Sequence, residues 1–195
     1  NRWMRWTGAK WEADDTLFAR HCARNICRDA AAECEVPRTQ SGIASSRTVY
    51  ATENLAKADL RLAARVDQWD ADKWILNTPV GVIDLRGAPD PQPHKPEHYL
   101  TKSTAVGPGG DCPRWLAFLD LVTGGDRELQ AFLRRIAGYA LTGDTGEHAL
   151  FFGFGLGANG KSIFTNTIAG IMGDYHVAAG IETFTASSGD RHPTE

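Results

Sequence analysis

The sequence predicts a mixed α/β protein, in which a mostly helical region is followed by the first strand–loop–helix unit of an incomplete α/β domain. Three observations support this prediction. Apolar residues recur at helical spacing in several segments between residues 14 and 143. A short apolar run near residue 150 is typical of a buried strand. The glycine-rich stretch GFGLGANGKSIF follows that run and leads into another segment with helical spacing.

The composition is that of an ordinary globular protein. Hydrophobic residues make up 42% and charged residues 23% of the 195 residues, which allows a sizeable core. No apolar run approaches the roughly 20 residues that span a bilayer, and the start, NRWMRWTGAKW, is unlike a signal peptide. With four cysteines the chain is no disulfide scaffold. We therefore expect a cytoplasmic protein that crosses no membrane.

The charge and the ends of the chain lead to two further expectations. The formal net charge of −3 gives no global basic field for nucleic acid, although a ring-shaped assembly can gather a few Lys and Arg on one inner surface. The chain begins with Asn1 rather than Met and stops at DRHPTE without a helix end. We therefore expect it to be a piece of a longer protein.

The first third of the chain is expected to form a short strand or hairpin and two helices. Residues 1–12 carry three tryptophans among basic residues, and we favour an aromatic cluster over a small core rather than base stacking. The segment 14–35 keeps helical spacing, and Asp14 or Asp15 can cap it. The second helix covers residues 51–66.

Residues 67–112 change in character. The apolar runs of WILNTPVGVIDL, broken by Pro79 and Gly81, predict a short hairpin. The proline-rich loop at 86–96 predicts an extended surface segment. The stretch AVGPGGDCP is typical of a linker.

Residues 113–145 predict two helices separated by the pair Gly124–Gly125, with Asp126 as the cap of the second helix. Residues 149–154, with the sequence ALFFGF, predict a short strand. The stretch SIFTNTIAGIMG then predicts a helix that ends at Gly173.

The glycine-rich stretch fits the P-loop pattern G-x-x-x-x-G-K-[ST]. Glycines let the backbone turn so that N–H groups point at phosphate oxygens, and the dipole of the following helix favours negative charge. Lys161 would reach the β- and γ-phosphates of ATP, and the Ser162 hydroxyl would bind Mg²⁺. The predicted nucleotide-binding residues are Gly155, Gly157, Ala158, Asn159, Gly160, Lys161 and Ser162.

The same letters contain G-x-G-x-x-G, the turn of dinucleotide-binding domains. Glu182 lies near the position where that motif places an acid for the ribose. However, that motif has no need of a Lys-Ser pair after its third glycine, and HVAAGIETF is a poor second strand. We therefore favour the P-loop.

Hydrolysis would also need a carboxylate that holds Mg²⁺ and positions water. Asp84 follows an apolar run but precedes the P-loop, and we interpret it as a turn or surface residue. The acids after Ser162 follow no convincing buried strand; they are Asp174, Glu182, Asp190 and Glu195. We expect no catalytic residue in this chain, because the acid and any arginine finger are missing.

Several other side chains have simpler interpretations. The group His21, Cys22, Cys27 and Cys34 lacks a C-x-x-C pair, and a helix would scatter it around its axis, so we interpret it as core or half-buried residues rather than as a zinc site. His94, His98 and Cys112 flank the proline-rich loop, and we do not favour metal binding there either.

Two charged pairs near the predicted P-loop have more open interpretations. Arg134 and Arg135 are interpreted as a solvated helix face rather than as contacts to phosphate or a neighbouring subunit. For Glu147 and His148, a role in orienting groups near the nucleotide and a plain loop role both stay open.

Six stretches in order resemble the phage and plasmid primase family, whose C-terminal motor is a superfamily 3 DNA helicase. They are WILNTPVGVIDL, PEHYLTK, CPRWLAFLD, GYALTGDTGEH, FGFGLGANGKS and GDRHPTE. The upstream half is similar to the domain that precedes this helicase in poxvirus and phage primase–helicases. The resemblance covers essentially the whole chain and is strongest over residues 69–195.

This resemblance implies an ATP-dependent DNA helicase of the AAA+ type that forms a ring, often a hexamer, and serves phage or plasmid replication in the bacterial cytoplasm. It implies a helicase-associated N-terminal domain at 1–112 and the truncated start of the helicase domain at 113–195. The latter divides into a helical lead-in at 113–145 and a P-loop unit at 146–195.

In the resembling family the Mg²⁺-holding acids, the sensor residue, the arginine finger and the DNA-gripping hairpin follow the HPTE segment. We therefore expect this chain alone to bind ATP weakly and not to hydrolyse it. Two alternatives remain open: a dinucleotide-binding oxidoreductase that uses the nested glycine motif, and a non-catalytic P-loop module that organises an oligomer.

Overall fold

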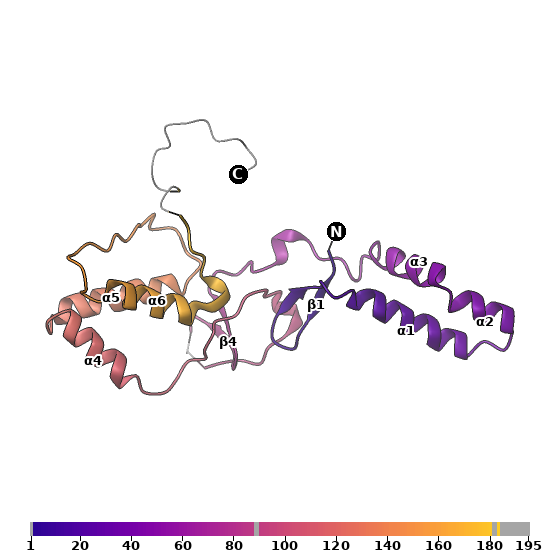
Figure 1. Cartoon of the computed structure of the whole chain (residues 1–195), viewed down its shortest axis with the longest axis horizontal. Helices are drawn as coiled ribbons and strands as arrows, with labels where there is room; N and C mark the ends of the chain where they lie inside the picture. Colours follow the sequence, from indigo (N-terminus) through magenta and orange to yellow (C-terminus); the bar gives the residue numbers. More distant parts are fainter. Residues whose placement is uncertain (1, 88–89, 181–182, 184–195) are drawn as a thin grey trace, which may run out of the picture.

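The computed structural model describes residues 2–87, 90–180 and 183. Within these residues the chain is mixed α/β, with two small antiparallel sheets and six α-helices. Figure 1 shows helices α1, α2 and α3 at one end, α4, α5 and α6 at the other, and the strands between them. The strands are β1 (Met4–Trp6), β2 (Trp11–Ala13), β3 (Ile75–Thr78) and β4 (Gly81–Asp84). The α-helices are α1 (Phe18–Ala32), α2 (Pro37–Ile43), α3 (Ser46–Ala56), α4 (Pro113–Val122), α5 (Arg127–Ala140) and α6 (Lys161–Met172). Three short 3₁₀ turns complete the set: η1 (Val66–Gln68), η2 (Pro96–His98) and η3 (Gly173–Tyr175).

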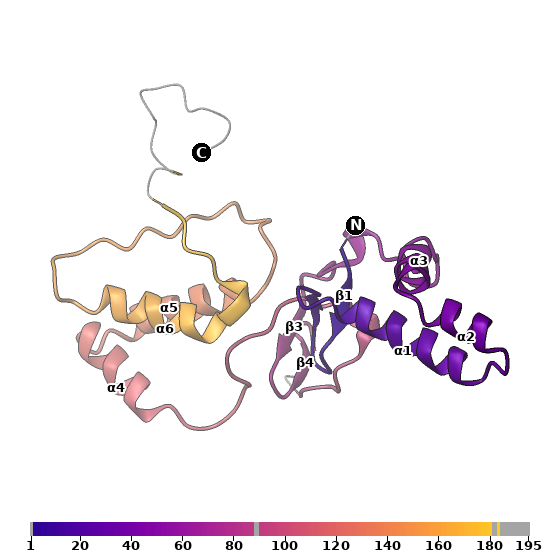
Figure 2. The ribbon, with the colours of Figure 1, turned by 45° about the vertical axis from the view of Figure 1, so that its right-hand side comes forward.

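Helix α1 packs against α2 and α3, and Figure 2 shows the three helices side by side with α3 seen nearly end-on. The small residues Ala23, Cys27 and Ala31 recur every four positions and are buried, so they lie on one face of α1. Ala23 and Cys27 meet Val49 of α3, and Ile43 of α2 closes the cluster. Small side chains let the helix axes approach closely.

The Asp14 carboxylate caps α1, as the sequence predicted for Asp14 or Asp15. It accepts the backbone N–H of Phe18 at 3.0 Å and that of Ala19 at 2.9 Å. The hydrogen bond from Ala19, helped by those from Phe18 and Thr16, lowers the pKa of Asp14 to about 2. Leu17 lies between cap and helix with a φ of 60°, so the helix begins four residues later than expected.

The helix expected at 51–66 is wrong in its bounds, because α3 runs from Ser46 to Ala56. The Ser45 hydroxyl caps it by accepting the backbone N–H of Thr48 at 3.3 Å. Beyond α3, the Asp59 carboxylate accepts both the backbone and the side chain of Arg61, which holds a turn in place of further helix. Helix α2 was not predicted at all.

The hairpin expected in WILNTPVGVIDL is present, and the first residues, expected as a short strand or hairpin, form a hairpin. Strands β1 and β2 pair antiparallel with Met4 opposite Ala13, and β3 and β4 pair with Thr78 opposite Gly81. Gly81 has a φ of 147°, and a Cβ there would lie 2.6 Å from the Gln92 carbonyl oxygen. The proline-rich segment therefore runs directly beside β4, where Gln92 bridges to Val82.

The tryptophans of the first hairpin form the expected aromatic cluster. Trp11 lies 5.7 Å from both Trp6 and Trp69, and Trp69 meets Tyr99 edge-on at 5.3 Å between ring centroids. The Trp11 indole N–H donates to the carbonyl of Pro96 at 2.8 Å. The cluster thus ties the first hairpin to the segment around η2.

Asn77 of β3 joins four segments that lie far apart in the sequence. Its side chain is fully buried, and the Nδ2 amide donates to the carbonyl of Ala9 at 3.0 Å and to that of Lys102 at 2.8 Å. Its backbone N–H donates to the Tyr175 hydroxyl at 3.1 Å, and its carbonyl accepts the N–H of Thr104 at 3.0 Å. Asn77 therefore fixes the first hairpin, the second hairpin, residues 102–104 and η3 against one another.

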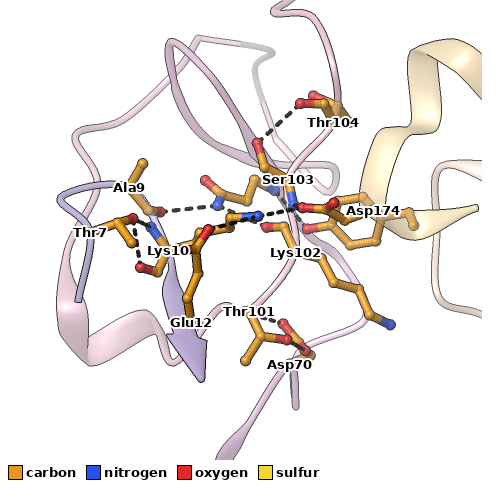
Figure 3. A network of polar contacts seen from close by, with 12 residues as sticks. Thr7, Ala9, Lys10, Glu12, Asp70, Thr101, Lys102, Ser103, Thr104 and Asp174 are labelled. Atoms are coloured by element: carbon orange, nitrogen blue, oxygen red, sulfur yellow. Dashed lines mark hydrogen bonds and ion pairs between the residues drawn. The ribbon is translucent and has the colours of Figure 1, made fainter. Parts of the chain in front are cut away.

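The end of α6 is held at the same place, as Figure 3 shows. The Lys10 ammonium binds Asp174 at 2.7 Å, and Asp174 also accepts the backbone N–H of Ser103 at 3.1 Å. The hydrogen bond from Lys10 lowers the pKa of Asp174. Gly173 has a φ of 55°, and a Cβ there would lie 2.8 Å from backbone atoms of Ser103 and Ala105. Only glycine fits this close approach.

No helix in the described ranges is both long and apolar enough to cross a membrane.

We expect Asn77→Ala to lower the free energy of unfolding by about 2–4 kcal/mol, because the carbonyls of Ala9 and Lys102 lose the buried amide that donates to them. The measurement is chemical denaturation of the chain. Asn166→Ala is the matched control, since Asn166 lies exposed on α6. Equal stability of the two variants would show that the Asn77 contacts do not hold the segments together.

The Asp14 cap predicts a specific loss of stability in acid. The folded pKa of about 2 lies below the ordinary 3.8, so the contribution of the cap is fully present above about pH 4 and disappears as the pH falls toward 2. Unfolding free energies measured across this window should converge for the wild type and Asp14→Ala. If the unfolding free energies of the two proteins differed by the same amount at every pH, the Asp14 carboxylate would not stabilise α1 as its cap.

Candidate functional site

The segment before the P-loop pattern folds as two helices, as predicted. Helix α4 ends before Gly124 and Gly125, which have φ values of 60° and 79°. The Asp126 carboxylate then accepts the backbone N–H groups of Glu128 at 2.9 Å and Leu129 at 3.0 Å. Asp126 is therefore the cap of α5 that the sequence indicated.

Helix α6 begins at Lys161 and contacts α4 through aromatic rings. Trp115 of α4 stacks on Phe118 of the same helix at 5.3 Å and on Phe164 of α6 at 5.7 Å between centroids. Gly160, directly before α6, has a φ of 85°, and a Cβ there would lie 2.6 Å from Val122. The position of the loop thus depends on the absence of a side chain at Gly160.

The strand expected at residues 149–154 is not formed. The segment has no strand partner in the described part of the chain, and a strand cannot exist without one. Phe151 meets Phe132 and Tyr139 of α5, but Phe152 and Phe154 are more than 80% exposed. In the described residues the expected strand–loop–helix unit is therefore reduced to a loop and a helix.

The predicted nucleotide-binding residues do form a turn that leads directly into α6. Gly155 has a φ of 156°, Ala158 of 58° and Gly160 of 85°. Apart from the two chain neighbours of Gly157, no described residue has a heavy atom within 4 Å of the position that a Cβ of Gly157 would take. The Ser162 side chain is exposed in the first turn of α6. The backbone therefore turns sharply and presents an open surface at the helix N-terminus.

The Lys161 ammonium lies against this turn. Its Nζ atom donates to the carbonyl of Gly155 at 2.9 Å, to that of Leu156 at 3.0 Å and to Asn159 Oδ1 at 2.7 Å. A Cβ on Gly155 would lie 2.5 Å from the Asn159 amide nitrogen and 3.5 Å from Nζ. The side chain of Lys161 is thus directed back toward the loop rather than into solvent.

The arrangement combines one cation, one hydroxyl and the positive end of a helix dipole. Helix α6 has 12 residues, so its N-terminal dipole is well developed. Such a site favours a polyanion, because the backbone N–H groups of the first turn lack intrahelical partners. The three acceptors now bound to Lys161 would have to be replaced by those of the anion.

The carboxylates considered from the sequence have other partners. Asp84 binds the Arg86 guanidinium at 2.8 Å, which lowers the pKa of Asp84, and accepts the Arg86 backbone N–H as the residue of a turn. Asp174 binds Lys10 beyond the far end of α6. Glu182, Asp190 and Glu195 lie outside the described residues.

The other candidates from the sequence do not gather into a site. In the described ranges no group of three or more His, Cys, Asp and Glu side chains could hold a metal ion. Cys27 is buried in the core of the α1–α3 group, as expected for a structural cysteine. Arg134 and Arg135 lie exposed on α5.

One group of residues was missed by the sequence prediction. Arg20, Arg24 and Arg28 line a groove beside α3 together with His21 and Tyr50. Their spacing of four residues on one predicted helix was the available signal.

Comparison with protein families matches residues 1–124 to the family described as D5 N terminal like. The match covers β1 to the end of α4 and stops before the glycine-rich turn. The search among curated proteins found no match.

We expect Gly160→Ala to lower the free energy of unfolding by about 2 kcal/mol, because the new Cβ is both strained and in collision with Val122. Combining it with Val122→Ala should recover the steric part but not the strain. A double-mutant cycle by chemical denaturation measures this coupling. Strict additivity would mean that the turn does not pack on α4.

Proposed function

The chain belongs to the D5 N terminal like family, which comprises N-terminal domains of D5-like primase–helicases, and from this premise we propose that it is the ATP-binding portion of a replicative DNA helicase. In this proposal the turn from Gly155 to Ser162 binds ATP and Mg²⁺. A ring of several copies, which we propose to be a hexamer, couples hydrolysis to DNA unwinding.

The observation that carries the proposal is the position of the Lys161 ammonium. It lies over a glycine-rich turn at the N-terminus of α6, hydrogen-bonded to Gly155, Leu156 and Asn159. A triphosphate is the polyanion that best suits a cation, a glycine turn and a helix dipole together. The order of these residues along the chain supports ATP over a simple anion.

Binding would proceed by exchange of partners. The β- and γ-phosphate oxygens replace the two carbonyls and the Asn159 oxygen as acceptors for Lys161. The free backbone N–H groups of the first turn of α6 donate to the phosphates. Ser162 is exposed at this turn, and its hydroxyl is the side chain that we propose for Mg²⁺.

Binding and hydrolysis make different demands. Hydrolysis needs a carboxylate that holds Mg²⁺ and orients water. Asp174, an acid at the other end of α6, lies about 18 Å away along the axis of this 12-residue helix and already binds Lys10. The described residues therefore support nucleotide binding, and we propose that turnover requires groups that other residues or other copies contribute.

We predict that the chain binds ATP with Mg²⁺ and that Lys161→Ala weakens this binding at least about tenfold, because the charge-assisted hydrogen bonds to phosphate are lost. Isothermal titration with ATP and Mg²⁺ measures the affinity. Lys95→Ala is the matched control, since Lys95 is an exposed lysine in the proline-rich segment. An unchanged affinity in Lys161→Ala would refute the site, and binding of NAD in place of ATP would favour a dinucleotide turn.

We further predict that the same preparation releases no phosphate from ATP above background. A colorimetric phosphate assay checks this directly. Turnover by the isolated chain that disappears in Lys161→Ala would show that it contains its own catalytic carboxylate.

A further inference from the structure

A basic groove runs between α1 and α3, at the opposite end of the molecule from α6 (Figure 1). Its volume is about 590 Å³. Arg20, Arg24 and Arg28 line one side, and Tyr50 of α3 lies on the other. This groove takes no part in the nucleotide site proposed above.

The charge of the groove is opposite to that of the chain. The whole sequence has a formal net charge of −3, yet three arginines and His21 line the groove and no Asp or Glu does so within the described residues. Local charge of one sign in a concave surface attracts ligands of the other sign. The groove is therefore suited to an anion.

Two of the three arginines are available for such a ligand. Arg20 binds Glu53 at 2.8 Å and lies over the Tyr50 ring at 4.4 Å, so its guanidinium is engaged within the protein. Arg24 and Arg28 are exposed, and neither is in an ion pair in the described part of the chain. Arg24 donates to His21 Nδ1 at 2.8 Å, which holds it along the groove.

The spacing of the arginines fits a polymer rather than a small anion. Residues four apart on one helix face lie about 6 Å apart along the axis. Two stacked nucleotides rise by about 7 Å on one strand. Arg24 and Arg28 thus form a pair of donors whose spacing is close to that of every second phosphate on a stacked strand.

Aromatic surface is exposed in the same groove. Tyr50 is 54% exposed and Phe18 is 42% exposed, and both line it. Grooves that combine a row of cations with exposed aromatic rings bind single-stranded nucleic acid, because the bases stack on the rings while the cations follow the phosphates. A duplex keeps its bases stacked inside and offers none to stack on the exposed part of these rings.

We propose that the α1–α3 groove is a binding site for single-stranded nucleic acid, in which Arg24 and Arg28 contact phosphates and Tyr50 and Phe18 stack with bases. The site requires no nucleotide at α6. Its test is therefore independent of the ATP site, and either proposal can fail alone.

The experiment measures binding of a fluorescein-labelled oligothymidylate of about 16 nucleotides, the upper end of the usual site size, by fluorescence anisotropy without ATP. For single strands each phosphate contact contributes about −0.7 to the slope of log affinity against log salt. Arg24→Glu with Arg28→Glu should reduce the slope by about 1.4 and the affinity at 0.1 M salt by about 25-fold or more. Tyr50→Ala should weaken binding with the slope unchanged.

The control pair Arg65→Glu with Arg127→Glu changes the net charge by the same amount at exposed arginines outside the groove. It should leave binding nearly unchanged, and all variants are compared at matched thermal stability. An equal loss in the control pair would show that only overall charge matters, and would overturn the proposal. Three other results would overturn the proposal as well. They are an absence of oligonucleotide binding, tighter binding to a duplex of the same length, and binding of an acidic peptide in the groove in place of the oligonucleotide.

Discussion

The structure depends on the buried side chain of Asn77. Its amide group binds carbonyls of two other segments, and its backbone binds Thr104 of one of these and Tyr175 of a further segment. A buried amide that lost these partners would be strongly unfavourable, so the four segments are held in one arrangement or not at all. The nearby ion pair of Lys10 and Asp174 extends the same junction to the end of α6. The strands are short, with only three or four residues each. The polar junction therefore fixes the position of one hairpin relative to the other, which the hydrogen bonds within each hairpin could not do.

The two ends of α6 lie in different surroundings. Its first residue, Lys161, belongs to the glycine-rich turn, and its last turn leads into Gly173, which lies against residues 103–105. A helix of this length is rigid, so a displacement of the residues at one end also moves the residues at the other end. The proposed ATP site is thus mechanically connected to the family-specific N-terminal part of the chain. The basic groove lies beyond this junction, between α1 and α3.

The sequence predicted correctly those elements that depend on a few neighbouring residues. Asp126 as a helix cap, the hairpin around Pro79 and the glycine turn before Lys161 all follow from short patterns with one physical meaning. The strand at 149–154 was wrong, because an apolar run becomes a strand only beside a partner, which no local pattern can supply. The junction at Asn77 was also beyond prediction, because it depends on which distant segments meet. The groove arginines did have a signal in their four-residue spacing, but that spacing does not say that Tyr50 of α3 lies beside them.

The contact between Lys10 and Asp174 joins residues 164 positions apart. During synthesis the ribosome releases a chain from its N-terminal end, so the first hairpin emerges long before its partner does. Until residue 174 has left the exit tunnel, Lys10 cannot form its ion pair with Asp174, and the first hairpin lacks this contact. Helices α1 to α3, whose contacts are local, can assemble in the meantime. The order of emergence therefore separates an early-folding group of three helices from a junction that closes late.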